Sequence, residues 1–264
     1  MSNLPSDSPL PPIGNRLTTL MLDLGGESLD APKFENAFRN NGKRADLLLF
    51  ARSLVVELKD LKDDPSGKMQ TIVDSFQGRP GFPIFYGRLP LNLVLQKASP
   101  AIAAEVREAV AHKLTEVLES IVEAANRQIR NTKHVLDLAE AGGLLFITNE
   151  SVPILDPSNV SYRMDRVLKK KKDGLPRYSE LQAVCFISEA HVATGLPSVP
   201  TEKSFPIISF QCARAPQSER VEQDLAYLLR LWGRVHGVPV VNHKFSESLT
   251  EQFKAENERL ERKQ

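Results

Sequence analysis

Short apolar runs alternate with amphipathic segments along most of the chain. The stretch KRADLLLFARSLVVELKD, residues 43–60, predicts two buried strands joined by a tight turn. Apolar runs at 144–150, 181–188 and 205–213 predict three further buried strands. Strands that are apolar throughout need cover on both faces of a sheet, so the pattern favours an α/β fold.

Helical periodicity fills the segments between these strands. Residues 100–141 carry an apolar residue at every third or fourth position until Gly142 and Gly143, which predicts one long helix. Further amphipathic segments predict helices at residues 30–40, 66–77, 158–172 and 218–237. In the first of these, Asp30 is the predicted N-cap and Pro32 lies in the first turn.

The remaining segments set the domain organisation. Residues 16–24 fit either a short strand or a helix, and residues 78–96, broken by glycine and proline, predict irregular extended chain. We expect residues 1–15 to form a disordered tail, because they are rich in proline and serine. No repeat or linker divides residues 16–245, which predicts one α/β domain with a mixed central sheet flanked by helices.

Residues 246–264 predict a charged C-terminal helix with one apolar side. Packing of this side on its own domain is one interpretation. The alternative is that the helix forms a homodimer contact or binds a partner protein.

Composition narrows the functional classes only slightly. The chain has 264 residues and a formal net charge of +1, so an anion-binding surface must be a local patch. The two cysteines, Cys185 and Cys212, lie in apolar runs and are expected to be reduced thiols. No apolar run approaches the ~20 residues that span a bilayer. We expect a cytoplasmic protein with no membrane contact.

The predicted hairpin carries three charged residues at one end. A two-residue turn at Ala51–Arg52 would place Asp46 directly opposite Glu57, with the two Cβ atoms roughly 5 Å apart. Lys59 lies two residues beyond Glu57 and therefore points to the same face. A longer loop with a shifted register is the alternative, because Ala-Arg is poor sequence for such a turn.

Two facing carboxylates repel each other unless a positive charge lies between them. A divalent cation such as Mg²⁺ fits, because it prefers hard oxygen ligands and commonly takes one or two carboxylates. Asp46, Glu57 and the backbone carbonyl oxygen of Leu58 are the predicted ligands, and Mn²⁺ is expected to substitute for Mg²⁺. Lys59 could then orient the attacking water and offset charge on a phosphate. The competing interpretation is an exposed ion pair between Glu57 and Lys59.

An acidic residue that opens one strand, followed by a (D/E)-x-K motif on the next, resembles the PD-(D/E)XK nuclease superfamily, which has the restriction-endonuclease-like fold. The matching residues are Ala45-Asp46 and Glu57-Leu58-Lys59. The resemblance implies a restriction-endonuclease-like core with C-terminal elaborations. It also implies a catalytic and metal-binding role for Glu35, on the helix before the hairpin.

Members of this superfamily often add a catalytic glutamine on the helix that follows the hairpin. Gln70 is nearer in sequence, whereas Gln128 lies on the long helix that leads into the next apolar strand. We favour Gln128 and leave Gln70 open. Two departures are the alanine at position 45, where proline is usual, and the missing first core strand, unless residues 16–24 supply it.

Basic residues suggest where a nucleic acid would bind. Arg130 and Lys133 follow Gln128 on the long helix and could contact phosphates. A second basic run contains Lys169, Lys170, Lys171 and Lys172. A solvated helix face or helix end explains the same residues without any ligand.

Two functional hypotheses follow. The first is a Mg²⁺-dependent nuclease that hydrolyses phosphodiester bonds, most simply a DNA endonuclease in defence, restriction, repair or mobile-element biology. The second is a non-catalytic nucleic-acid-binding or scaffold subunit that retains a nuclease-like α/β core.

Overall fold

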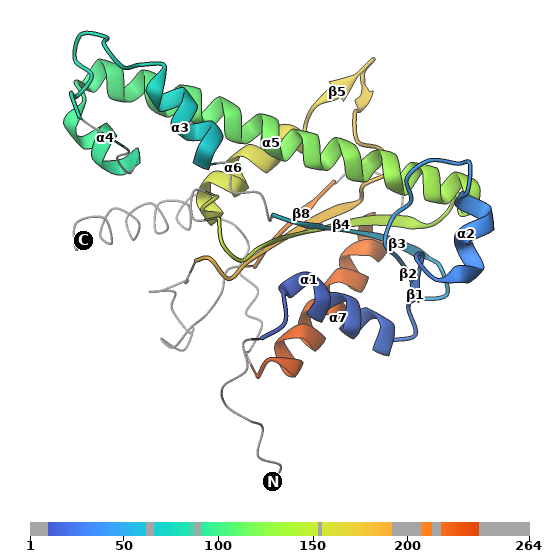
Figure 1. The fold of residues 1–264 in the computed structure, drawn as a ribbon. Helices are drawn as coiled ribbons and strands as arrows, with labels where there is room; N and C mark the ends of the chain where they lie inside the picture. The colour runs from blue at the N-terminus through green and yellow to red at the C-terminus, as the bar shows by residue number, and fades with distance from the viewer. Residues whose placement is uncertain are drawn as a thin grey trace.

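A computed structural model describes residues 10–61, 66–85, 87, 91–152, 155–191, 207–212 and 218–237. Its centre is a six-stranded sheet in the order β1-β2-β3-β4-β7-β8 (Figure 1). The strands are β1 (Glu27–Ser28), β2 (Leu47–Leu49), β3 (Leu54–Asp60), β4 (Gly142–Asn149), β7 (Ala183–Ser188) and β8 (Ile207–Gln211). β3, β4 and β7 run parallel, and the outer strands pair antiparallel. The predicted α/β fold with a mixed central sheet is therefore confirmed.

Helices cover both faces of the sheet, as Figure 1 shows. α1 (Ile13–Asp23) and α7 (Ser218–Val235) lie on one face, and α5 (Pro100–Val135) and α6 (Pro157–Leu168) lie on the other. Side chains of β3 alternate between the two layers, because Val55 packs on the α5 side whereas Leu54 and Val56 pack on the α1–α7 side. This alternation decides which face receives the charged end of β3.

The long helix α5 has 36 residues and is about 54 Å long. It begins as predicted at Pro100, where the Ser99 hydroxyl accepts a hydrogen bond from the Ile102 N–H. It ends at Val135, short of the predicted end at 141, because Asp137 adopts a left-handed φ of 53°. The glycines that suggested the end belong to β4. A Cβ at Gly143 would lie 2.0 Å from the Glu180 carbonyl oxygen, so this strand position requires glycine.

The smaller elements correct several expectations. Residues 16–24 lie almost wholly in α1, which begins at Ile13, so residues 13–15 are helical and do not belong to a disordered tail. The first strand of the sheet is β1, at residues 27–28, where no strand had been predicted. Within the segment predicted to be irregular, α4 (Leu91–Lys97) is helical. α3 (Ser66–Asp74) lies where a helix was expected.

Two predicted helices have different ends in the structure. α2 (Pro32–Phe38) has Ala31 at its N-cap, and Asp30 instead forms an ion pair with Arg44. α6 ends at Leu168, so the lysine run does not extend it. Lys171 and Lys172 form β5 (Lys171–Lys172), which pairs with β6 (Leu175–Pro176) in a separate two-stranded sheet. The predicted helix at 246–264 lies outside the described residues.

The β2–β3 hairpin has the predicted register. Leu47 faces Val56 and Leu49 faces Leu54, and the Ser53 N–H donates to the Phe50 carbonyl oxygen at 3.1 Å. Ala51 and Arg52 both have positive φ, 52° and 66°, which is the conformation of a primed two-residue turn. The Arg52 guanidinium donates two hydrogen bonds to Glu27, which ties this unfavourable turn sequence to the neighbouring strand.

Among the described residues, every helix is too short or too polar to cross a bilayer. Cys185 is buried, Cys212 is partly buried and neither forms a disulfide, as the apolar surroundings predicted.

Candidate active site

The acidic pair lies where β2 and β3 meet beneath α5. Asp46 extends the pairing of β2 by one residue, because its N–H donates to the Val56 carbonyl oxygen at 3.1 Å. The Asp46 carboxyl group lies beside that of Glu57, close enough that each shifts the pKa of the other. Both side chains belong to the α5 side of the sheet, since the neighbouring Leu47, Val56 and Leu58 pack on the other side.

Glu57 is fully buried, with 0% of its surface exposed. Both carboxylate oxygens are enclosed, and neither accepts a hydrogen bond of normal geometry from a described residue; Oε1 makes only an ion pair with the Lys59 ammonium. Burial and the negative charge of Asp46 together raise the pKa of Glu57 to about 8. A pKa of about 8, reached although the Lys59 ammonium lowers it, favours the protonated Glu57 carboxyl group at neutral pH in the absence of a metal ion.

Asp46 is half-buried and, unlike Glu57, accepts a hydrogen bond from the backbone. Its Oδ2 accepts a hydrogen bond from the Leu58 N–H at 2.7 Å. Burial raises the pKa of Asp46, while the Leu58 N–H and the Lys59 charge oppose that rise. The two carboxyl groups thus have unequal environments, and Asp46 is the member of the pair whose charge the protein supports.

Lys59 is held between the acidic pair and the long helix. Its ammonium pairs with Glu57 and donates to the Gln128 side-chain oxygen at 3.0 Å. The Gln128 amide in turn donates to the Arg44 carbonyl oxygen at 2.8 Å. About 30% of the Lys59 side chain remains exposed, so the ammonium is reachable from solvent.

The structure decides between the two glutamines. Gln128 contacts Lys59, whereas Gln70 donates to Asp74 within α3 and is not part of this group. Four of the residues predicted for one site, Asp46, Glu57, Lys59 and Gln128, therefore lie together. The role predicted for the Leu58 carbonyl oxygen stays a prediction.

Glu35 does not join this group. It is exposed on α2, whose inward face is occupied by the buried rings of Phe34 and Phe38. Within the described ranges, no cluster of three or more histidine, cysteine, aspartate or glutamate side chains is placed to hold a metal ion. The expectation that Glu35 supplies a third carboxylate is therefore not supported by the geometry.

Two residues that sequence reasoning missed brace the approach to Asp46. The buried hydroxyl of Thr132 accepts a hydrogen bond from the Ala45 N–H at 2.8 Å. The Asn131 amide donates to the carbonyl oxygens of Asn41 and Lys43. Together with Gln128 they lie three and four residues apart on α5, so one side of the helix fixes residues 41–45. The signal in the sequence was the spacing of these three polar residues, which places them on one side of an otherwise amphipathic helix.

The acidic pair fits a hard divalent cation. Neither buried carboxylate oxygen of Glu57 has a hydrogen bond of normal geometry to a described residue, and the Asp46 carboxyl group lies beside them. Such a pair is costly to ionise without a cation and is sufficient for Mg²⁺, which commonly completes its shell with water. The fit requires only the two carboxylates that the structure brings together.

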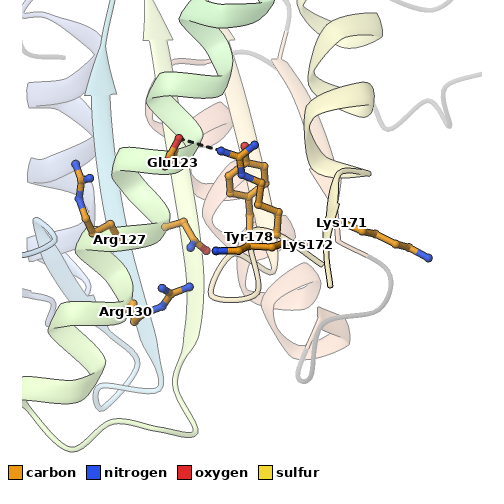
Figure 2. A pocket seen from close by; sticks show the side chains of 8 residues that line it. Glu123, Arg127, Arg130, Lys171, Lys172 and Tyr178 are labelled. Carbon is orange, nitrogen blue, oxygen red and sulfur yellow. Dashed lines mark hydrogen bonds and ion pairs between the residues drawn. The ribbon is translucent and has the colours of Figure 1, made fainter. Parts of the chain in front are cut away.

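The predicted basic residues separate into two groups. Lys133 is only 6% exposed and pairs with Glu180, so burial lowers its pKa and it cannot reach a phosphate on the surface. Lys169 pairs with Asp165 and Lys170 pairs with Glu119. Arg130, Lys171 and Lys172 instead line a cleft beside α5 (Figure 2).

Comparisons of the chain with protein families, with curated proteins and with solved structures find no match.

Proposed function

We propose that this protein is a metal-dependent nuclease that hydrolyses phosphodiester bonds, with DNA as its substrate. One observation carries the proposal: the adjacent Asp46 and Glu57 carboxyl groups, with Lys59 held beside them by Gln128. Two acids that share a buried site and a lysine at its exposed edge are suited to hold a cation and to approach a phosphate.

A bound Mg²⁺ or Mn²⁺ would supply Lewis-acid polarisation of a phosphate oxygen and a water of lowered pKa. Asp46 and Glu57 are the residues that would hold it, with Glu57 giving up its proton on binding. The Lys59 ammonium would orient the attacking water and offset the charge that develops on the phosphate. Gln128 would keep the Lys59 ammonium in place through its side-chain oxygen.

The order of elements supports a restriction-endonuclease-like core. α1 precedes β1, β2 and β3, the long α5 follows, and β4 then pairs parallel with β3. A helix followed by an apolar strand after the (D/E)-x-K strand is the arrangement that the resemblance implies. On this assignment β7, β8 and α7 are the C-terminal elaborations.

The direct test is cleavage of plasmid, linear and single-stranded DNA by purified protein with Mg²⁺ or Mn²⁺. We expect Glu57→Gln and Lys59→Met each to lower the rate by about 10²–10³-fold, because each removes a group that acts on the reacting phosphate or its cation. Glu35→Gln is the matched control and should retain full activity, since Glu35 lies outside the site. Equal cleavage by all four proteins would identify a contaminant and refute the proposal.

One observation favours the second candidate, a non-catalytic nucleic-acid-binding subunit. The described residues offer two carboxylates at this site and no third metal-ligating side chain. A subunit of this kind would bind nucleic acid without cleaving it and without responding to Mn²⁺. Nucleic-acid binding combined with no cleavage and no Mn²⁺ binding would select this candidate.

A further inference from the structure

A second site lies on the solvent side of α5, where the β5–β6 hairpin stands beside the helix. The two elements enclose a cleft of about 470 Å³ (Figure 2). Its lining residues are Glu123, Asn126, Arg127, Arg130, Lys171, Lys172, Arg177 and Tyr178. The cleft thus collects five cations against one carboxylate in a protein whose formal net charge is only +1.

The positive charge of the cleft is only partly neutralised. Arg177 pairs with Glu119 and Glu123, and Arg130 lies 3.7 Å from Glu180. By contrast, Arg127, Lys171 and Lys172 form no ion pair with any residue in the part of the chain that the structure describes. All three are exposed, and Lys172 extends toward α5, whereas Lys171 points away from the cleft and Arg127 lies on the outer side of α5 (Figure 2).

The walls of the cleft are fixed by contacts that do not use these three cations. The buried Tyr178 donates its hydroxyl proton to Glu119 at 3.1 Å, and Lys170 pairs with the same carboxylate. The Asn126 side-chain oxygen accepts a hydrogen bond from the Glu180 N–H at 3.0 Å. The hairpin is therefore tied to α5, and an anion would meet a preformed site.

The rotation of α5 connects this cleft with the acidic pair. Successive helix residues are rotated by about 100°, so Arg130 lies almost opposite Gln128, about 200° around the axis. Arg127 is about 100° from Gln128 and about 60° from Arg130, and therefore lies between them on the exposed side. A chain of phosphates that passes over α5 from Lys59 to the cleft would meet Arg127 on the way.

We propose that this cleft binds the phosphodiester backbone of a nucleic acid strand at a position separate from the acidic pair. Arginine side chains present paired N–H donors that match phosphate oxygens, and lysines add point charges. The only aromatic side chain of the lining, Tyr178, is buried, so the cleft offers no exposed ring on which a base could stack. We therefore expect phosphate contacts to dominate binding and the affinity to depend little on base sequence. That the bound strand is also the cleaved strand rests on the proposed function.

The test is equilibrium binding of a fluorescein-labelled single-stranded DNA oligonucleotide in EDTA, measured by fluorescence anisotropy. The triple variant Arg127→Gln, Arg130→Gln, Lys172→Gln removes the exposed cations along α5 and the inward-facing lysine of the hairpin. We expect it to bind about tenfold more weakly and to lower the slope of log K against log salt by about 2, because each single-strand phosphate contact contributes about 0.7. Circular dichroism and thermal melting establish that the variant is folded.

The matched control removes the same charge elsewhere, through Arg79→Gln, Lys97→Gln and Lys113→Gln at the α3–α4 end of the molecule. Its affinity should stay within about twofold of wild type at 150 mM salt, where charges farther away than about 8 Å are screened. Equal losses in both triple variants, or no loss in the cleft variant, would overturn the proposal. Displacement of the oligonucleotide by an equal concentration of tripolyphosphate would also overturn it, since the site would then take a small phosphate ligand.

Omission of the metal separates this proposal from the nuclease proposal. A wild-type protein that binds DNA through the cleft and never cleaves it would leave the cleft assignment standing and remove the nuclease. A protein that cleaves DNA, with a cleft variant that binds and cleaves like wild type, would remove only the cleft assignment.

Discussion

The two sides of α5 treat charge in opposite ways. Beneath the helix, Asp46 and Glu57 lie together where Glu57 has no exposed surface and, among the described residues, only an ion pair with Lys59. On the outside, Arg127, Lys171 and Lys172 are exposed and form no ion pair with the residues that the structure describes. Burial makes ionisation of the two carboxyl groups unfavourable, so a bound metal ion would change their charge. The exposed cations are charged at little cost in free energy, and salt screens them.

This difference separates the energetics of the two sites. A charge in the acidic pair can change stability by several kcal/mol, because its neutral and ionised forms are solvated very differently. A charge in the cleft changes stability little and acts mainly on the encounter with an anion. The buried acidic pair therefore lowers the stability of the folded protein, whereas the exposed cations on the other side of the same helix hardly change it.

The largest effect expected on stability comes from the pH dependence of Glu57. Its pKa is 4.5 in the unfolded chain and about 8 in the folded protein, so between these values the folded state holds a proton that the unfolded state has released. The free energy of unfolding in EDTA should therefore fall as pH rises through this window, by on the order of a few kcal/mol. Urea unfolding at pH 6 and pH 9 measures this change.

Glu57→Gln provides the control for that experiment, because an amide of the same shape cannot ionise. We expect the variant to be more stable than wild type at pH 9 and to lose most of the decrease between pH 6 and pH 9. If the decrease in stability between pH 6 and pH 9 is the same in Glu57→Gln as in wild type, a group other than Glu57 causes it. That result would contradict the account of the buried acidic pair.

A smaller effect is expected from the bracing contact of Thr132. Thr132→Val keeps the shape of the side chain but leaves the buried Ala45 N–H without its acceptor, which should cost about 1–3 kcal/mol of unfolding free energy. Chemical denaturation measures the loss. Thr71→Val, at an exposed position of α3 with only a local backbone contact, should change stability by less than about 0.5 kcal/mol. Equal effects of the two substitutions would show that the Thr132 contact adds nothing.

The smallest effect on stability is expected on the outer side of α5. Arg127→Gln removes an exposed charge that pairs with none of the described residues, so the free energy of unfolding should stay within about 0.5 kcal/mol of wild type. The salt slope for single-stranded DNA should nevertheless fall by about 0.7, the contribution of one phosphate contact. Thermal melting and a salt titration of binding measure the two quantities. A large loss of stability would show that Arg127 is a structural residue.

The acidic pair could be predicted from local sequence, whereas the other residues of the site are brought there by contacts between distant parts of the chain. The β2–β3 register, which brings Asp46 beside Glu57, follows from a short turn and from the alternation of side chains along a strand, both of which can be read within residues 43–60. Gln128 could not be separated from Gln70, because its contact with Lys59 joins residues far apart in sequence. Thr132 was missed for the same reason, since its partner is Ala45.

Glu35 is the predicted site residue that the structure does not bring to the acidic pair. Its position before the hairpin suited the predicted role, but the rotation of α2 is fixed by burial of Phe34 and Phe38, which turns Glu35 to solvent. The two-residue strand β1 was equally hard to predict, because its pairing with β2 carries almost no pattern of its own.

The central claim is that Asp46 and Glu57 together hold a divalent cation, and direct binding of Mn²⁺ tests it. Titration of the protein, followed by the electron paramagnetic resonance of free Mn²⁺ and by calorimetry in two buffers, gives the number of sites and the protons released. We expect a site at the pair that is lost in both Asp46→Asn and Glu57→Gln, with proton release on binding at pH 7 because Glu57 must ionise. Mn²⁺ binding that survives both substitutions, or no binding by the wild-type protein, would contradict the account.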